Sequence, residues 1–325
     1  MKRIKQVLVF VFVLSFIACS NNKDADQADV SAGNINEVSI VINDTFWNGE
    51  VGDSIRKELA APVDGLTQEE PIFTLTQFHE KAFEGILKKG RNLVIIEKGA
   101  KSDFTYKRNK ECTPQNVFTI TGRSIDDMLN LIEMHSDEIV KTIRNTEIAE
   151  VQRRNAKAGL LDEKLIPQQF GISIKTPATY KQALKNDSFL WLKKDIPGGN
   201  ASLLIYTVPV NVVERHKTIN DNLIKMRDSI GNMYIHGQEP GTFMLTEEAY
   251  SPYIFPTSFN ESRAFEMRGN WQMESDMSGP FINYTIMDNK RNRYLVIEGF
   301  IYSPSSPKRD LLLELESIIK SLELK

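Results

Sequence analysis

The feature that most constrains the fold is one long helical segment at residues 124–159. Ser124 suits the N-cap position, and Asp126 and Asp127 follow it where the helix dipole favours acidic side chains. Apolar residues then recur at helical spacing, and Gly159 suits the C-terminal end. At about 1.5 Å per residue, roughly 35 residues would extend over about 50 Å. We expect this helix to cover one sheet and then bridge to a second sub-domain.

Strand patterns dominate the chain before this helix. Val38, Ile40 and Ile42 alternate with other residues in the first of them, which begins at Glu37. The remaining elements that we predict are strands at 72–76, 92–97 and 116–121 and helices at 53–60 and 77–88.

A second sub-domain is predicted to begin around Pro167. Ser306 and Pro307 suit the N-cap and first turn of a final helix with an apolar stripe. The other predicted elements are strands at 170–174, 189–192, 203–206, 263–274, 281–287 and 294–302 and helices at 178–184 and 212–230. The expected class is therefore α+β, with mainly antiparallel sheets flanked by helices and two sub-domains (37–159 and 160–325) bridged by the long helix.

The first nineteen residues have the pattern of a secretory signal peptide. A basic start is followed by an apolar run at residues 7–18, which is too short for a bilayer core that needs roughly 20 residues. The run ends in Phe16-Ile17-Ala18-Cys19, which resembles a bacterial lipobox. We therefore expect cleavage after residue 18 and a membrane anchor on lipidated Cys19; the alternative is an uncleaved signal anchor.

Residues 20–36 are rich in Asn, Asp, Ser and Ala and lack apolar periodicity, which indicates a flexible tether. Lys23-Asp24, followed by Asp26 and Asp29, resembles the acid-rich signals that place some lipoproteins on the outer face of Gram-negative cells. A solvated linker is the other interpretation. We expect location in the cell envelope at the outer membrane, with either the periplasmic or the surface-facing side left open.

Charge and cysteine content exclude some classes of function. The chain has 40 basic and 43 acidic residues, and three of the basic ones lie in the signal, so the remainder has a net charge of −6. Without a dense basic cluster, nucleic acid is not an expected partner. Once Cys19 is lipidated, Cys112 is the remaining thiol and no intramolecular disulfide can form. We favour a packing role for Cys112 over a reactive nucleophile, because no histidine lies near it in sequence.

No catalytic or metal-binding motif is present. The four histidines (His79, His135, His216 and His236) form no H-E-x-x-H motif or pair at ligand spacing, and there is no G-x-S-x-G motif. We therefore assign no catalytic residue, metal ligand or cofactor.

The stretch 241–265 is unusually aromatic and contains Pro252 and Pro256, which exclude a regular helix or a central strand. Its rings either line a binding groove or fold back onto the sheet as packing. We expect Phe243 and Phe265 to be buried anchors. The candidate binding rim comprises Tyr250 and Tyr253, with Glu247 and Arg268 as neighbouring polar groups.

Several segments together resemble an uncharacterised family of envelope lipoproteins from Bacteroidota-type bacteria, classed as a domain of unknown function. The resemblance covers nearly the whole mature chain and implies no activity or catalytic residue. The second half is also similar in its order of elements to PsbP-like α/β/α sandwiches. The segments that carry the family resemblance are 46–52, 69–71, 91–92, 268–271, 279–281, 298–304 and 308–310.

Three functions are consistent with these observations. The leading hypothesis is a non-catalytic binding or assembly factor at the outer membrane, with an envelope protein or a small ligand as partner. The second is an envelope hydrolase that uses Asp or Glu as acid and base. The third is a purely structural envelope component.

Overall fold

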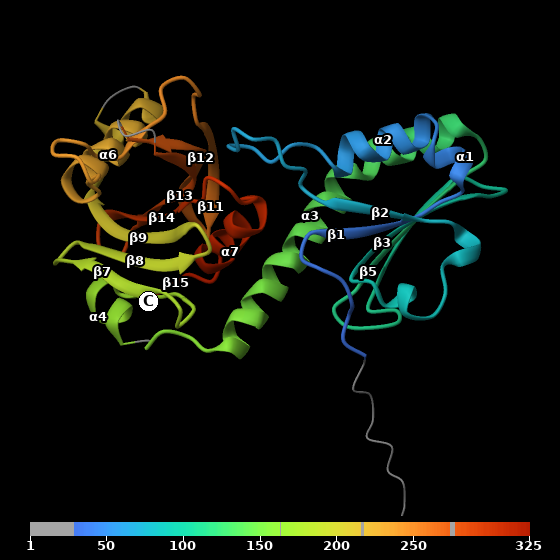
Figure 1. The fold of residues 1–325 in the computed structure, drawn as a ribbon, viewed down its shortest axis with the longest axis horizontal. Helices are drawn as coiled ribbons and strands as arrows, with labels where there is room; N and C mark the ends of the chain where they lie inside the picture. Colours follow the sequence, from blue (N-terminus) through green and yellow to red (C-terminus); the bar gives the residue numbers. More distant parts are fainter. Residues whose placement is uncertain (1–28, 163, 216–217, 274–276) are drawn as a thin grey trace, which may run out of the picture.

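The computed structural model describes residues 29–162, 164–215, 218–273 and 277–325. Cys19 and His216 lie outside these residues, as does most of the predicted tether. The described strands form three sheets, and helix α3 (Ile125–Ala158) links two parts of the molecule (Figure 1). This confirms the predicted α+β class, with mainly antiparallel sheets and a long bridging helix.

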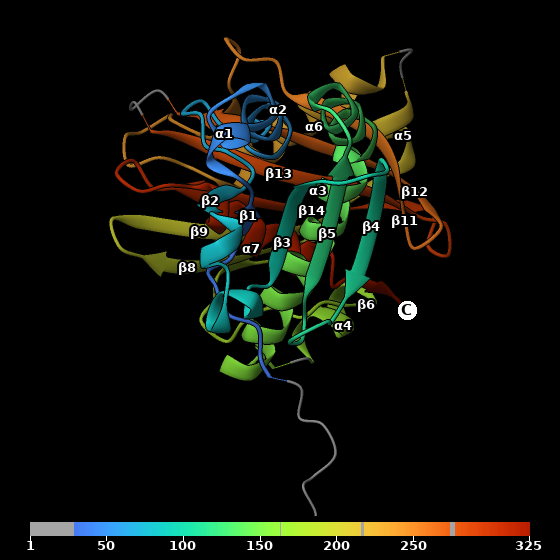
Figure 2. The same cartoon turned by 90° about the vertical axis from the view of Figure 1, so that its right-hand side faces the viewer.

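The N-terminal part is built on a five-stranded sheet with strand order β2-β1-β3-β5-β4. The first four strands in that order pair in parallel, and β4 pairs antiparallel with β5. Helices α2 and α3 pack on one face of the sheet (Figure 2). The bounds are β1 Glu37–Val41, α1 Asp44–Trp47, α2 Glu50–Leu59, β2 Thr74–Phe78, β3 Asn92–Lys98, β4 Asp103–Arg108 and β5 Asn116–Gly122.

Two local expectations for this part were wrong. The helix predicted at 77–88 is absent: β2 extends to Phe78, and two short 3₁₀ turns follow at Glu80–Ala82 and Gly85–Lys89. Pairing of β2 with β1 along its whole length extends the backbone here, and Gly85 has a positive φ of 57° that an α-helix does not accept. The edge strand β4 was not predicted, because most of its side chains are polar and it has no buried face to impose alternation.

Backbone hydrogen bonds of the described residues already involve Asp29 and Ala32, ahead of the expected start of folding at Glu37. The Thr113 amide donates to the Asp29 carbonyl at 2.8 Å, and the Ala32 amide donates to the Lys89 carbonyl at 2.8 Å. Asn36 is fully buried.

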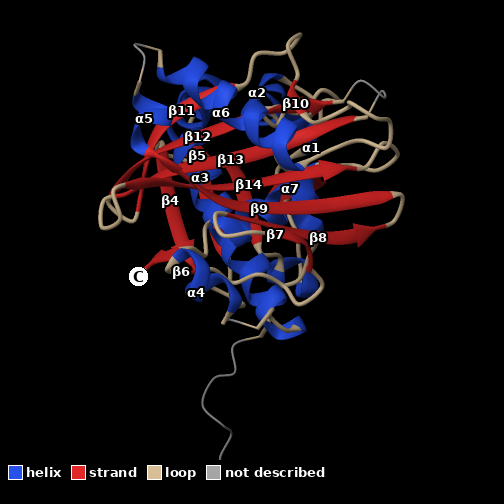
Figure 3. Ribbon diagram, turned by 90° about the vertical axis from the view of Figure 1, so that its left-hand side faces the viewer, coloured by secondary structure: helices blue, strands red, loops and turns tan. Residues whose placement is uncertain are grey.

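The C-terminal part is built on an eight-stranded antiparallel sheet (Figure 3). Helices α4 and α7 bury apolar residues on one face, and α5 and α6 cover the other. A two-stranded sheet, β6 with β15, lies beside it. The bounds are α4 Leu165–Phe170, β6 Ile172–Ser173, β7 Lys181–Lys185, β8 Phe189–Ile196, β9 Gly199–Pro209, α5 Val210–Glu214, α6 Ile219–Tyr234, β10 Leu245–Thr246, β11 Tyr253–Phe259, β12 Ser262–Gln272, β13 Ser278–Asp288, β14 Arg293–Tyr302, α7 Arg309–Ile319 and β15 Glu323–Leu324.

The strands β8, β9, β12, β13 and β14 agree with the sequence, but three helical expectations do not. The segment expected as a helix at 178–184 contains strand β7, which pairs with β8 at the sheet edge. The helix expected at 212–230 is divided into α5 and α6. The final helix begins at Arg309, not at the predicted Ser306 cap. At 178–184, strand pairing with β8 outweighs the local helical preference.

Residues 61–71 form an arm that extends from the N-terminal part to the eight-stranded sheet (Figure 1). The Val63 amide donates to the Glu70 carbonyl at 2.9 Å and closes the arm at its base. At the tip, Gly65 has φ +84° and lies so close to β12 that a Cβ atom would be 3.0 Å from the Gly269 nitrogen. Leu66 packs against the core on the α7 side of the sheet. The arm therefore contacts both parts of the molecule.

The arm also supplies the N-terminal cap of α7. The two carboxylate oxygens of Glu70 accept hydrogen bonds from the Lys308 amide at 2.7 Å and the Arg309 amide at 2.9 Å. This carboxylate takes the place of the predicted Ser306 cap, and its charge is favourable at a helix N-terminus. Further bonds that join the parts include Asn36 Nδ2 to Asp310 Oδ1 at 2.8 Å and Gln152 Nε2 to the Ser317 carbonyl at 2.8 Å.

Candidate functional site

A cleft of about 750 Å³ lies between the arm and the segment 249–253. Its floor is formed by Gly269 and Asn270 of β12, and its two walls come from different parts of the molecule. The volume is in the range of small-molecule and peptide sites. The lining residues are 61–67, Glu69, 249–251, Tyr253, Gly269 and Asn270.

Two tyrosines of the predicted rim line this cleft. Tyr250 is 60% exposed and Tyr253 is 51% exposed. The ring of Tyr253 stacks on that of Phe255, with centroids 6.4 Å apart and planes at 9°. Both residues are in β11 and, two positions apart, they share one face of the strand. Exposed aromatic area therefore continues from the cleft along β11.

The two expected anchors of the aromatic stretch, Phe243 and Phe265, differ in how deeply they are buried. Phe265 is buried in the core on the α6 side of the sheet, as predicted. Phe243 is only half-buried, so the expectation of a fully buried anchor there was wrong. Apolar packing of the stretch comes instead from Met244, which is buried in that core.

Strand β11 presents an edge with one missing donor. It pairs with β12, and a two-residue turn at Asn260 and Glu261 joins the strands. Because Phe259 and Ser262 form the hydrogen-bonded pair that closes such a turn, Pro256 falls in a non-hydrogen-bonded pair and its nitrogen faces away from β12. Proline has no N–H to offer there, which weakens the edge as a template for another strand. Side chains, more than the strand edge, are available for recognition.

Of the two polar residues predicted beside the tyrosines, Arg268 has its guanidinium paired with carboxylates. Arg268 Nε lies 2.5 Å from Glu266 Oε1, and its Nη2 lies 3.0 Å from Glu316 Oε2. The Arg268 side chain is nearly buried and lines a neighbouring, smaller cleft. Glu247 is half-buried, and its amide donates to the Asn270 carbonyl at 2.8 Å.

An ionic network lies behind the cleft, beside a smaller cleft of about 260 Å³. Glu316 of α7 is paired with both Arg268 and Arg144 of α3. Burial alone would raise the pKa of Glu316, but the two arginines outweigh it and lower the pKa to about 2. The Tyr284 hydroxyl donates to Glu266 at 2.5 Å, and burial raises the pKa of Tyr284 well above its usual value. These carboxylates are held as counter-ions.

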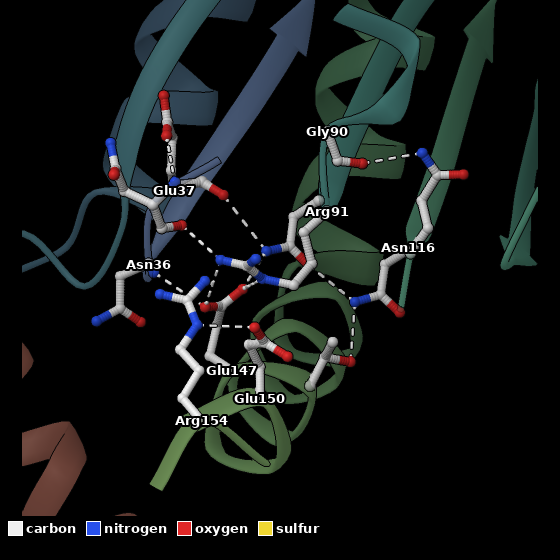
Figure 4. Close-up of polar contacts among 12 residues, drawn as sticks. Asn36, Glu37, Gly90, Arg91, Asn116, Glu147, Glu150 and Arg154 are labelled. Atoms are coloured by element: carbon white, nitrogen blue, oxygen red, sulfur yellow. Dashed lines mark hydrogen bonds and ion pairs between the residues drawn. The ribbon is translucent and has the colours of Figure 1, made fainter. Parts of the chain in front are cut away.

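A second buried polar cluster connects the sheet of the N-terminal part to α3 (Figure 4). Glu147 is fully buried and accepts hydrogen bonds from Arg91 Nε at 2.7 Å and Nη2 at 3.2 Å. It also accepts from Asn92 Nδ2 at 2.6 Å and from the Asn36 amide at 3.1 Å. Asn116 Nδ2 donates to Asn92 Oδ1 at 2.8 Å and extends the cluster to β5. The cluster joins the beginnings of three parallel strands to one helix.

A shallow cleft of about 440 Å³ lies next to this cluster and is lined in part by Tyr106 and Arg153. Glu150, also in its lining, bonds to Arg153 and Arg154. The hydrogen bond from Arg153 is the main reason that the pKa of Glu150 is lowered to about 2. The ion pairs leave this carboxylate poorly suited to act as a general acid at neutral pH.

Cys112 is buried, and its thiol lies 3.2 Å from the Lys89 carbonyl. Burial raises the pKa of the thiol, which favours the packing role over a reactive thiolate. The described residues contain no group of three or more His, Cys, Asp or Glu side chains arranged to hold a metal ion. None of the helices in these residues has the length and apolarity of a membrane span.

The fold has distant likenesses among solved structures. Cyanobacterial PsbP (CyanoP) from Synechocystis sp. PCC 6803 is 6% identical, with a TM-score of 0.32 over 48% of this chain and 87% of that one. The Ran-binding protein Mog1p of Saccharomyces cerevisiae is 8% identical, with a TM-score of 0.27 over 48% of this chain and 92% of that one. Neither likeness carries an argument about function. No curated protein matches the chain.

Family comparisons give two matches, one for each part of the molecule. Residues 31–156 match the family described as Domain of unknown function (DUF8532). Residues 160–321 match Domain of unknown function (DUF4837). The chain thus carries, one after the other, segments similar to two families of uncharacterised domains.

Proposed function

We propose that this chain is a lipid-anchored envelope protein and a non-catalytic binding or assembly factor. Its binding surface is the cleft between the arm and segment 249–253. The observation that carries the proposal is the exposure of Tyr250 and Tyr253 at a cleft of about 750 Å³. Tyrosines give a large contact area at a low cost in conformational entropy, and they are enriched at recognition surfaces.

The support of the cleft favours binding. Glu70 fixes the base of the arm to α7, and Gly65 fixes its tip against β12. Arg268, which lines the adjoining smaller cleft, is held by two carboxylates. A site whose walls are already held in place loses less conformational freedom when a partner binds.

Changing Tyr250 and Tyr253 together to Ala is expected to remove partner binding without unfolding the protein. Exposed substitutions usually cost under about 0.5 kcal/mol each. A photo-cross-linking amino acid at Ser251, between the two rings, should form adducts in intact cells that disappear in the double variant. Thermal denaturation checks that the fold is retained.

The matched control is Phe265→Ala in the same stretch, which should cost about 3–5 kcal/mol because that ring is buried. A cross-linker at exposed Lys101 in the other part reports background contacts. Adducts at Ser251 that persist in the double variant, or that are no stronger than those at Lys101, would contradict the proposal.

Changing Cys19 to Ala is expected to move the protein from the membrane fraction to the soluble or precursor pool. A signal-like segment that ends at Cys19 supports this, and firm anchoring needs more than one acyl chain, at about 0.8 kcal/mol per buried CH₂. Membrane fractionation measures where the protein is found, and mass spectrometry of the mature N-terminus measures whether the chain is cleaved and lipidated there. Cys112→Ala, at the other cysteine, should stay membrane-bound; a membrane-bound Cys19→Ala protein of mature size would disprove the anchor.

A further inference from the structure

We propose that the cleft binds a basic, extended peptide segment of a partner protein, with Arg or Lys side chains on the rings of Tyr250 and Tyr253. This inference rests on the proposed function and adds the chemistry of the partner.

The first argument is the charge of the cleft. Asp64 and Glu69 line it, and Glu248 adjoins it; all three are exposed. None of the three forms an ion pair with a cation among the described residues. The lining includes no lysine or arginine. The mouth of the cleft is therefore a region of uncompensated negative charge, which attracts a cationic ligand.

The two arginines that line the adjoining smaller cleft do not neutralise this charge. Arg268 is committed to Glu266 and Glu316, and Arg144 of α3 is committed to Glu316. The carboxylates behind the cleft thus have partners, whereas those at its mouth do not. A cation supplied from outside the described residues would neutralise the carboxylates at the mouth of the cleft.

The second argument is the aromatic surface. A guanidinium or ammonium group is attracted to the face of a tyrosine ring, more strongly where water is excluded. The same kind of contact already occurs in this chain, where the Arg56 guanidinium lies 4.5 Å from the ring centroid of Trp47. Tyr250 and Tyr253 offer exposed rings beside the carboxylates, so both attractions act on one cation.

The shape of the surface favours a peptide over a small polycation. Phe255, 43% exposed, continues the aromatic strip along β11 to the smaller cleft. The two clefts share Pro62, Val63 and Asp64 of the arm, so they lie on a continuous path. Pro256 weakens strand addition along this path, which leaves alternating side chains to make the contacts.

The test uses short fluorescein-labelled peptides in which Arg or Glu alternates with Leu, with anisotropy as the measurement. The Arg peptide should bind the full-length protein, and added salt should weaken this binding because it screens the charges. The Glu peptide should not bind. The double variant Asp64→Asn, Glu69→Gln should weaken binding about threefold to tenfold, since two exposed ion pairs are lost. The matched variant Glu84→Gln, Asp103→Asn changes exposed acids of the N-terminal part that lie outside the cleft and should bind normally.

Three results would overturn the inference: equal binding of the Glu peptide, no effect of the Asp64 and Glu69 changes, or complete displacement by spermine at equal charge concentration. The Tyr250 and Tyr253 variant separates this inference from the proposed function. If its adducts at Ser251 disappear while the acidic variant binds normally, only the basic-peptide inference fails. If the tyrosine variant also behaves as wild type, the proposed binding surface fails.

Discussion

Changing Glu147 to Gln is expected to lower the free energy of unfolding by about 3–5 kcal/mol, the usual cost of leaving a buried charge without its partner. The carboxylate is fully buried and accepts four hydrogen bonds, two of them from Arg91. A glutamine keeps the shape but places an NH₂ group against donors. Urea denaturation measures the effect.

The exposed Glu133 on the same helix provides the control, since Glu133→Gln should change the free energy of unfolding by less than about 0.5 kcal/mol. The double variant Arg91→Met, Glu147→Met should lose less than the sum of the single variants, because neither charge is then left alone. A loss below about 1 kcal/mol for Glu147→Gln would show that the cluster does not support the fold.

A loss of stability in acid is the second large effect that we expect, and Glu316 is its main source between the two parts. Its folded pKa of about 2 lies below the ordinary value of 4.5. The contribution is therefore complete above pH 4.5 and is lost as the pH falls towards 2. From these two values, this group alone should lower the free energy of unfolding by about 2 kcal/mol between pH 7 and pH 3.

Glu316→Gln removes the titration, so the difference in unfolding free energy between pH 7 and pH 3 should be about 2 kcal/mol smaller than in the wild type. The variant is also less stable at pH 7, because Arg144 and Arg268 lose a shared carboxylate. Glu84→Gln, on the surface and outside the ionic network, is the matched control variant. A parallel pH profile for wild type and Glu316→Gln would show that another group controls the acid response.

The tyrosine rim shows how far sequence reasoning reached at the candidate site. Two prolines and clustered aromatics indicated a segment outside a regular helix or central strand. The edge strand β11 begins at the exposed Tyr253, and the exposed Tyr250 precedes it. Arg268 could not be placed in the same way. Its charge suggested an exposed rim residue, but its partner Glu316 lies on a helix that no local sequence signal connects with Arg268.

Local signals were sufficient for α3 and for the strands β12, β13 and β14. Cap residues, apolar periodicity and turn residues act over a few positions, so they can be read along the chain. They failed at 77–88 and 178–184, where strand pairing with β1 and β8 outweighs helical preference.

The arm and the cleft were decided by tertiary structure alone. Glu70 caps a helix 238 positions away at Lys308, and Gly65 fits against Gly269 because neither has a side chain in the way. Contacts at that separation have no pattern in a single sequence, since each residue type is compatible with many surroundings. Composition and short-range order indicated most of the elements and the predicted anchor; long-range packing determined which of their surfaces face each other, and so where the cleft lies.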